Sequence, residues 1–375
     1  MTTHSKIRVA FVALGLLPVL ALAATGQDPA GRIKSQIDHL RQEVDRSPVS
    51  RPEWKQAKPD IAAFLQRADD DLRAGRLYVS LEEMASAWDS LRGTKGATEK
   101  NEQELLKEGQ PDVESRVKQT QIDITAIEKE AAQKSWDTVP VAVRALAEKA
   151  GGKTLNLLDG AHGFAMLTDI EENARSENYA SALYYAGEGE AQAQFNAFCR
   201  TLDLPRKTAA FPLRSIAPEL EQLQTRVMAA YRPPGSVDHH AEFIRLNATL
   251  KLARELDAAR LYAGALYQYL DATQQFAMFD KVAPTAAGQS SLRNSLLDLR
   301  QQLRTSQQDQ SIAQLFLERA ESDLTRSPGA SSWISVSTIV EQVLPAYSAA
   351  LKASTASEHR ATPGVTVTLV RWPYT

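Results

Sequence analysis

The hydrophobic positions of this chain recur with the period of an α-helix. Apolar residues follow one another in steps of four and three through four segments, which places each set along one helix face. The four sets are Ile33, Ile37, Leu40 and Val44; Val113, Val117, Thr120, Ile124, Ile127 and Ala131; Ile216, Leu220, Leu223 and Val227; and Leu292, Leu296, Leu299 and Leu303. Each stripe lasts only two or three heptads, so the pattern predicts a bundle or stacked helical hairpins rather than a long coiled coil.

Glycine and proline divide this helical pattern. Ser50-Arg51-Pro52-Glu53 predicts a capped helix start. Helices are predicted to stop at 93–98, 109–111, 151–152, 232–235, 284–288 and 327–329. The longest irregular connection, 204–218, holds three prolines and marks a predicted boundary. An N-terminal helical region, 24–204, is therefore expected to precede a C-terminal helical region, 205–353.

The last residues change character. Residues 354–375 begin as a polar linker, and Val365 to Trp372 then alternate like a β-strand, with Val367 and Leu369 inside the run. A lone strand has no ladder partner within a helical protein, so it could pack back on the domain, add to a partner's or twin's sheet, or stay disordered. The predicted fold is all-α, as helical hairpins, a bundle or an irregular α-solenoid, with one strand-like tail.

Composition narrows the class of protein. The 375 residues carry 43 Lys and Arg against 46 Asp and Glu, a formal charge of −3, which lacks the basic surplus of a general nucleic-acid binder. The hydrophobic fraction of 43% supports a packed core. The single cysteine, Cys199, cannot form an internal disulfide and is expected to be a buried small side chain on a helix.

The N-terminus has the features of an export signal. Lys6 and Arg8 precede an apolar run, Pro18 ends it, and Ala21-Leu22-Ala23 fits a signal peptidase site. We predict cleavage of residues 1–23, export to the periplasm or outside the cell, and no integral span afterwards. The alternative is an uncleaved signal that anchors an adaptor to the membrane.

One seven-residue pattern occurs twice. Leu72 to Tyr78 (LRAGRLY) recurs as Leu256 to Tyr262 (LDAARLY), and Tyr179 to Tyr184 recurs as Tyr262 to Tyr267. Residues 64–72 and 316–324 also resemble each other in sequence. The helix holding Tyr262, Ala265, Leu266, Tyr269 and Ala272 resembles the second helix of tetratricopeptide repeats, although the copies are irregularly spaced. This resemblance implies a scaffold of helical hairpins that binds a protein partner.

Motifs with catalytic potential have simpler structural interpretations. Residues 147–154 (AEKAGGKT) fit a relaxed phosphate-binding loop, but no strand pattern precedes them. Gly151-Gly152 is therefore interpreted as a helix end. On this interpretation, Lys153→Ala should leave stability and ligand binding nearly unchanged. Asp69-Asp70-Asp71 is interpreted as a solvated, salt-bridged face. Asp238-His239-His240-Ala241-Glu242 is the one dense cluster of potential metal ligands.

Tyrosines gather in the repeated helices. They are expected to pack at helix seams, or alternatively to form a concave binding face. The candidate partner-binding residues are Tyr179, Tyr262, Tyr269, Val367, Leu369 and Trp372. We predict an exported, non-catalytic scaffold with a protein partner or self-association and no cofactor. The alternative is a helical enzyme or metal-binding protein that uses Asp238 to Glu242.

Overall fold

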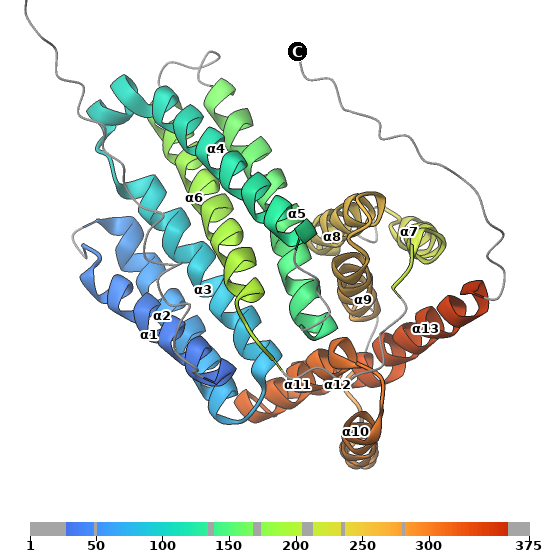
Figure 1. Cartoon of the computed structure of the whole chain (residues 1–375). Helices are drawn as coiled ribbons and strands as arrows, with labels where there is room; N and C mark the ends of the chain where they lie inside the picture. Colours follow the sequence, from blue (N-terminus) through green and yellow to red (C-terminus); the bar gives the residue numbers. More distant parts are fainter. Residues whose placement is uncertain are drawn as a thin grey trace, which may run out of the picture.

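The computed structural model of the chain describes residues 28–48, 51–133, 139–167, 174–204, 213–233, 237–279 and 282–358. Side chains are described throughout these ranges except at 130–133 and 353–358. The described residues form helices joined by short turns, so the predicted all-α class is confirmed (Figure 1). The predicted signal sequence, 1–23, and the predicted strand-like tail with Val367, Leu369 and Trp372 lie outside the described residues.

The helices follow one another closely along the chain. Their bounds are α1 Pro29–Arg46, α2 Pro52–Arg73, α3 Leu77–Thr98, α4 Glu102–Gln133, α5 Val141–Met166, α6 Arg175–Arg200, α7 Ala217–Ala230, α8 His240–Ala258, α9 Tyr262–Ala277, α10 Ala286–Thr305, α11 Ser311–Arg326, α12 Ala330–Thr338 and α13 Leu344–Glu358. A short 3-10 turn, Val237–His239, precedes α8, and a π-helical turn, Ile339–Val343, joins α12 to α13.

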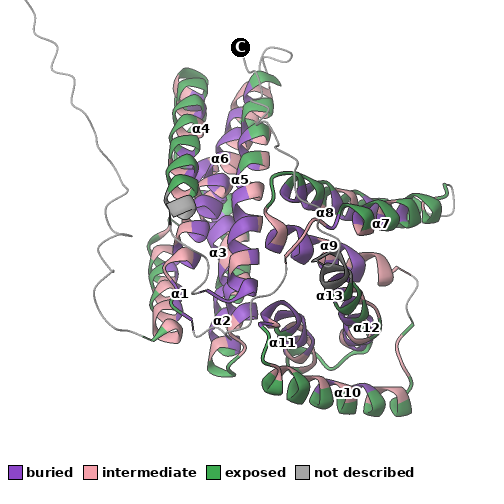
Figure 2. Ribbon diagram, turned by 45° about the vertical axis from the view of Figure 1, so that its right-hand side comes forward, coloured by how far each residue is buried: buried purple, intermediate pink, exposed green. Residues whose placement is uncertain are grey.

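Helices α3, α5 and α6 form the centre of the molecule. Each packs on the other two, α4 lies along α5 and α6, and α9 and α11 close the side of α5. The buried faces of α3, α5 and α6 point toward one another (Figure 2). The predicted stripes of α1 and α7 are buried in full, and Cys199 is buried as expected.

One hydrophobic core runs across the predicted domain boundary. It begins at Ile33 on α1 and continues through Leu146 and Leu266 to Ala350 on α13. A smaller cluster, which includes Leu105, Val113 and Tyr179, fills the far end of α4, α5 and α6. The N-terminal and C-terminal helices therefore share packing instead of burying two separate cores, with α5 as the helix that contacts both α6 and α9.

The two copies of the seven-residue pattern adopt the same turn. After α2, Gly75 has φ of +76°, and the N–H groups of Gly75 and Arg76 bond back to Leu72 and Asp71. After α8, Arg260 has φ of +63°, and Arg260 and Leu261 bond back to Asp257 and Leu256 in the same way. Both turns are Schellman caps, and both connect consecutive antiparallel helices. The structural register is shifted by one residue from the sequence match, because Arg260 and not Ala259 takes the left-handed position of Gly75.

Three of the predicted helix stops are wrong. Helix α3 continues through 93–98, α4 through 109–111, and α5 through 151–152. Glycines there permit close helix packing: a Cβ at Gly96 would overlap the carbonyl oxygen of Leu183, and one at Gly152 would lie 2.8 Å from Leu256. The predicted breaks at 284–288 and 327–329 do contain helix ends, and Pro52 opens α2 as expected.

Four helices receive N-terminal caps from distant parts of the chain, namely from three other helices and from Asp309 in the connection between α10 and α11. At or beside the first turn of each, a backbone N–H donates to a buried carboxylate that lies far away in the sequence. The pairs are Tyr78 of α3 with Glu318 (2.8 Å), Val141 of α5 with Asp309 (2.9 Å), Ile216 before α7 with Asp257 (2.8 Å), and Gly264 of α9 with Glu148 (2.8 Å). A carboxylate at a helix N-terminus is also favoured by the helix dipole, so these contacts fix the order in which the helices pack.

One helical segment of the described chain, Ala330–Lys352, is long and apolar enough to cross a membrane by length and composition. This differs from the expectation that no segment after the signal would qualify. Half of its most apolar window is buried against the rest of the protein, as in a core helix, and core helices meet the same criterion. Trp333, Val336 and Ile339 carry this burial.

Candidate functional site

A cavity of about 400 Å³ opens where the N-terminal helices meet α9 and α11. That volume lies in the range of small-molecule sites. Its lining comes from α2, α3, α5, α6, α9 and α11 and consists of Phe64, Val79, Glu82, Glu83, Ala85, Ser86, Asp89, Leu146, Lys149, Lys153, Gln192, Phe195, Tyr267, Asp271, Arg319, Ser322, Asp323 and Arg326. The cavity therefore exists only when both halves of the chain are packed together.

Helical spacing explains why these residues share one space. On α3, Val79, Glu82, Ser86 and Asp89 recur in steps of three and four and so lie on one face. Lys149 and Lys153 repeat the step on α5, as do Arg319 and Arg326 over two turns of α11. Helices α3, α5 and α11 thus each present one stripe that carries charged side chains to the cavity.

Arg319 is the centre of the polar wall. Its guanidinium donates to Glu82 at 2.8 Å on α3, to Asp271 at 2.9 Å on α9 and to the hydroxyl of Tyr267 at 2.7 Å. The Tyr267 hydroxyl in turn donates to Glu82. Burial raises the pKa of Tyr267 well above its ordinary value, so the phenol stays protonated as a donor. These contacts tie α3, α9 and α11 into one network.

A second ion pair lies deeper, between α3, α5 and α6. The ammonium of Lys153 donates to Asp89 at 2.8 Å, and the amide of Gln192 donates to both carboxylate oxygens of Asp89 at 2.5 Å. Burial raises the pKa of the Asp89 carboxyl, although Lys153 opposes this shift. The sequence predicts that Lys153→Ala is nearly neutral, whereas this pair leads us to expect a loss of stability, because the change would leave a buried carboxylate without its cation.

Lys149 differs from the other cations of the lining. Its ammonium donates to the Tyr267 hydroxyl at 3.3 Å and lies 4.8 Å from the centre of the Tyr267 ring. No carboxylate of the described residues approaches it within 4 Å. Burial lowers the pKa of Lys149, and the attraction of Glu82 and Asp271 opposes that shift.

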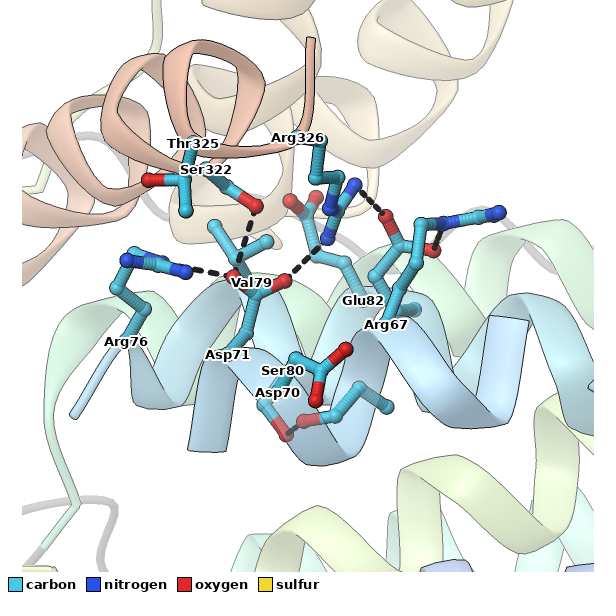
Figure 3. A network of polar contacts seen from close by, with 12 residues as sticks. Arg67, Asp70, Asp71, Arg76, Val79, Ser80, Glu82, Ser322, Thr325 and Arg326 are labelled. Carbon is cyan, nitrogen blue, oxygen red and sulfur yellow. Dashed lines mark hydrogen bonds and ion pairs between the residues drawn. The ribbon is translucent and has the colours of Figure 1, made fainter. Parts of the chain in front are cut away.

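Asp71 of α2 accepts hydrogen bonds from two residues of the cavity lining, Ser322 and Arg326 (Figure 3). Asp71 is fully buried and accepts from Arg76 at 2.7 Å, from Ser322 at 2.7 Å and from Arg326. Arg326 also donates to Glu83 at 2.7 Å. The expected solvated face of Asp69, Asp70 and Asp71 is thus only partly correct: all three carry ion pairs, but Asp69 and Asp71 are buried and only Asp70 is exposed.

The hydroxyl groups of the lining are all engaged as donors. Ser86 donates to the Glu82 carbonyl at 3.2 Å, Ser322 to Asp71, and Tyr267 to Glu82. The lining contains neither histidine nor cysteine among its residues. This arrangement offers fixed donors, fixed acceptors and an apolar wall, which are features of ligand-binding sites.

The structure separates the predicted partner-binding tyrosines. Tyr179 of α6 is only 5% exposed and packs against Gly109 of α4, so it belongs to a helix seam. Tyr262 and Tyr269 are half-buried on α9, and Tyr269 packs against the main core. The tyrosine that does reach the cavity is Tyr267, on the same helix.

The residues of the proposed metal cluster face different partners. His240 lies 2.9 Å from the Tyr231 hydroxyl, His239 stacks on Phe279, and Glu242 pairs with Arg245 at 3.2 Å. Within the described residues, no group of three histidine, cysteine or acidic side chains could hold a metal ion. Residues 147–154 lie inside α5, so they do not form the turn that a phosphate-binding loop requires.

Sequence reasoning missed the cavity because its residues come from six helices whose contacts span up to 243 positions, as between Glu83 and Arg326. A partial signal was present: residues 64–72 and 316–324, which resemble each other, lie on the two helices that meet at Asp71 and Ser322. No known family model, curated protein or solved structure matches this chain.

Proposed function

We propose that this chain is an exported, non-catalytic binding protein whose helical scaffold carries one small-molecule site. The observation behind this proposal is the cavity of about 400 Å³ between α3, α5, α9 and α11. Cavities of this size that combine an apolar wall with a few fixed polar groups are typical of ligand sites.

The walls of the cavity favour binding because they are organised in advance. Arg319 makes charged contacts with α3 and α9, and Asp71 joins α2 to α11. The buried cap from Glu318 to Tyr78 adds a further link between α11 and α3. A site whose side chains are already fixed loses little conformational entropy when it binds a ligand.

A catalytic role has less support from the same residues. Four of the five acids of the cavity pair with neighbouring cations, and the hydroxyls donate to carboxylates or carbonyls. The alternative of a metal site at Asp238 to Glu242 would require His239 and His240 to leave their aromatic neighbours, Phe279 and Tyr231.

A protein partner or self-association remains part of the proposal for the C-terminal tail. Val367, Leu369 and Trp372 lie on the alternating segment, which could add a strand to a partner's sheet. The tetratricopeptide resemblance supports this use of the scaffold, and it too stays a proposal.

Native mass spectrometry of protein purified from its own cells without denaturation tests the cavity as a binding site. We expect a non-covalent mass that is released when the protein is unfolded. Ser86→Phe, which places a ring in the cavity, should abolish this mass. Ser290→Phe is the matched control, since Ser290 makes the same serine-to-carbonyl bond at 3.2 Å on the exposed face of α10. Wild-type protein without any released mass, or equal retention by Ser86→Phe, would contradict the proposal.

A further inference from the structure

Among the cations of the lining, three pair with carboxylates of the described chain and one does not. Four of the five acids of the lining pair with a cation: Glu82 and Asp271 share Arg319, Glu83 pairs with Arg326, and Asp89 pairs with Lys153. The fifth acid, Asp323, accepts a hydrogen bond from the Ser335 hydroxyl. Arg319, Arg326 and Lys153 are occupied by those same contacts. Lys149 is the one lining cation that has no carboxylate within ion-pair distance among the described residues.

The ammonium of Lys149 keeps donors for a ligand. A lysine ammonium has three N–H donors, and within the described chain Lys149 uses one of them, toward the Tyr267 hydroxyl at 3.3 Å. The packing of α5 fixes its position, because Leu146 and Ala150 on either side are buried in the core. The side chain is half-buried, so water competes for it less than at the surface.

An apolar wall lies beside this ammonium. Leu146, Phe195 and Val79 line the cavity and are each no more than 3% exposed, and Phe64 adds a half-buried ring at the rim. Leu146 is on the same helix as Lys149, one turn earlier. A single free cation next to aliphatic and aromatic side chains matches a molecule with an acidic group at one end and an apolar body.

We propose that the cavity binds a small amphipathic organic anion, whose acidic group accepts hydrogen bonds from Lys149 and whose apolar body lies against Leu146 and Phe195. This inference rests on the proposed binding function and names the class of ligand. A cationic ligand fits less well because four of the five acids of the lining already pair with Arg319, Arg326 or Lys153, and the fifth, Asp323, accepts from Ser335.

A pair of dyes that differ in one acidic group tests this inference. Anilinonaphthalenesulfonate carries a sulfonate on an aromatic body, and phenylnaphthylamine has the same body without the charge. Both are titrated into the wild type and into Lys149→Met, with Lys107→Met as the control because Lys107 is 81% exposed on α4. Ser86→Phe reports whether each dye enters the cavity. Lys149→Gln is the second variant in case Lys149→Met does not fold, and melting curves verify the folding of every variant.

We expect the wild type to bind the sulfonate dye at least about tenfold more tightly than the neutral dye. Lys149→Met should weaken the affinity for the sulfonate dye by about tenfold or more and should leave the affinity for the neutral dye within about twofold of the wild-type value. Lys107→Met should not change the affinity for either dye, and Ser86→Phe should abolish the binding of both.

Three results would overturn the inference. If both dyes depend on Ser86 but Lys149→Met alters neither, the cavity binds ligands without an anion preference, and the proposed function survives alone. If the sulfonate dye binds Ser86→Phe as it binds the wild type, the dye sits elsewhere. If neither dye binds the wild type, the cavity does not accept an aromatic anion.

Discussion

Glu318 of α11 accepts the backbone N–H of Tyr78 at 2.8 Å and so caps α3 from a position 240 residues away in the sequence. The Val79 N–H reaches the same oxygen at 3.3 Å. Glu318 is 5% exposed, and burial raises the pKa of its carboxyl to about 7. This contact joins the last part of the chain to the first helices beside the cavity.

The raised pKa of Glu318 predicts a specific pH dependence of stability. Between its ordinary pKa of 4.5 and about 7, the folded state holds a proton that the unfolded state has released. Stability should therefore fall as the pH rises through this range, and should change no further above it. Glu318→Gln keeps the acceptor oxygen without the charge. Relative to this variant, the free energy of unfolding of the wild type should fall by about 3 kcal/mol between pH of about 4 and about 8.

Urea unfolding of both proteins at several pH values measures this difference, and shifts at other acids cancel in the comparison. A difference that does not vary with pH would mean that Glu318 titrates at its ordinary pKa and is not buried at the α3 terminus.

Lys153 and Asp89 should be energetically coupled. Lys153→Ala is expected to destabilise the protein by about 1–3 kcal/mol, because it leaves the buried Asp89 carboxylate with Gln192 alone. Asp89→Asn removes the charge that needs compensation, so the double variant should lose at least about 1 kcal/mol less than the sum of the single variants. Lys251→Ala breaks an exposed ion pair with Glu255 and should stay within about 0.5 kcal/mol of the wild type. If the stability losses of the two single variants simply add in the double variant, the ion pair between Lys153 and Asp89 is not formed.

The helix crossing between α3 and α6 depends on glycine. A Cβ at Gly187 would overlap the carbonyl oxygen of Arg92, so Gly187→Ala should cost about 2 kcal/mol or more. Gly163 lies on α5 with open space around it, and Gly163→Ala should stabilise by about 0.5–1 kcal/mol because alanine favours the helix. Thermal melts should therefore move in opposite directions for the same chemical change. Equal shifts would contradict the close approach of the two helices.

How much of this fold could be read from the sequence depends on the range of each interaction. The stripe of Ile33, Ile37, Leu40 and Val44 is local, and it correctly predicts the buried face of α1. The helix end predicted at Gly151 and Gly152 is wrong because glycine has two roles: it ends helices, and it permits two helices to pack closely. Here the contact of Gly152 with Leu256 decides for close packing, and the local sequence does not show that contact.

The candidate site depended still more on distant contacts. Tyr179 and Tyr267 belong to the same repeated pattern, yet one is buried at a seam and the other lines the cavity. The pairing of Lys153 with Asp89 joins residues 64 positions apart, and no local spacing encodes it. Buried caps such as Asp257 at Ile216 likewise replace the local capping residues that a sequence search looks for.

Export predicts a defined mature N-terminus. Because Ala21-Leu22-Ala23 fits a signal peptidase site, intact-mass measurement of protein from the cell envelope should give a chain that begins at Ala24. A full-length mass in the membrane fraction would instead support the anchored adaptor.

The most direct test of the central claim is an experimental structure of the protein purified from its own cells under non-denaturing conditions. The proposed binding function predicts a bound organic molecule in the cavity, with an acidic oxygen about 3 Å from Nζ of Lys149 and an apolar part against Leu146 and Phe195. A cavity that contains only water, with Lys149 turned toward Glu82 or Asp271, would contradict it.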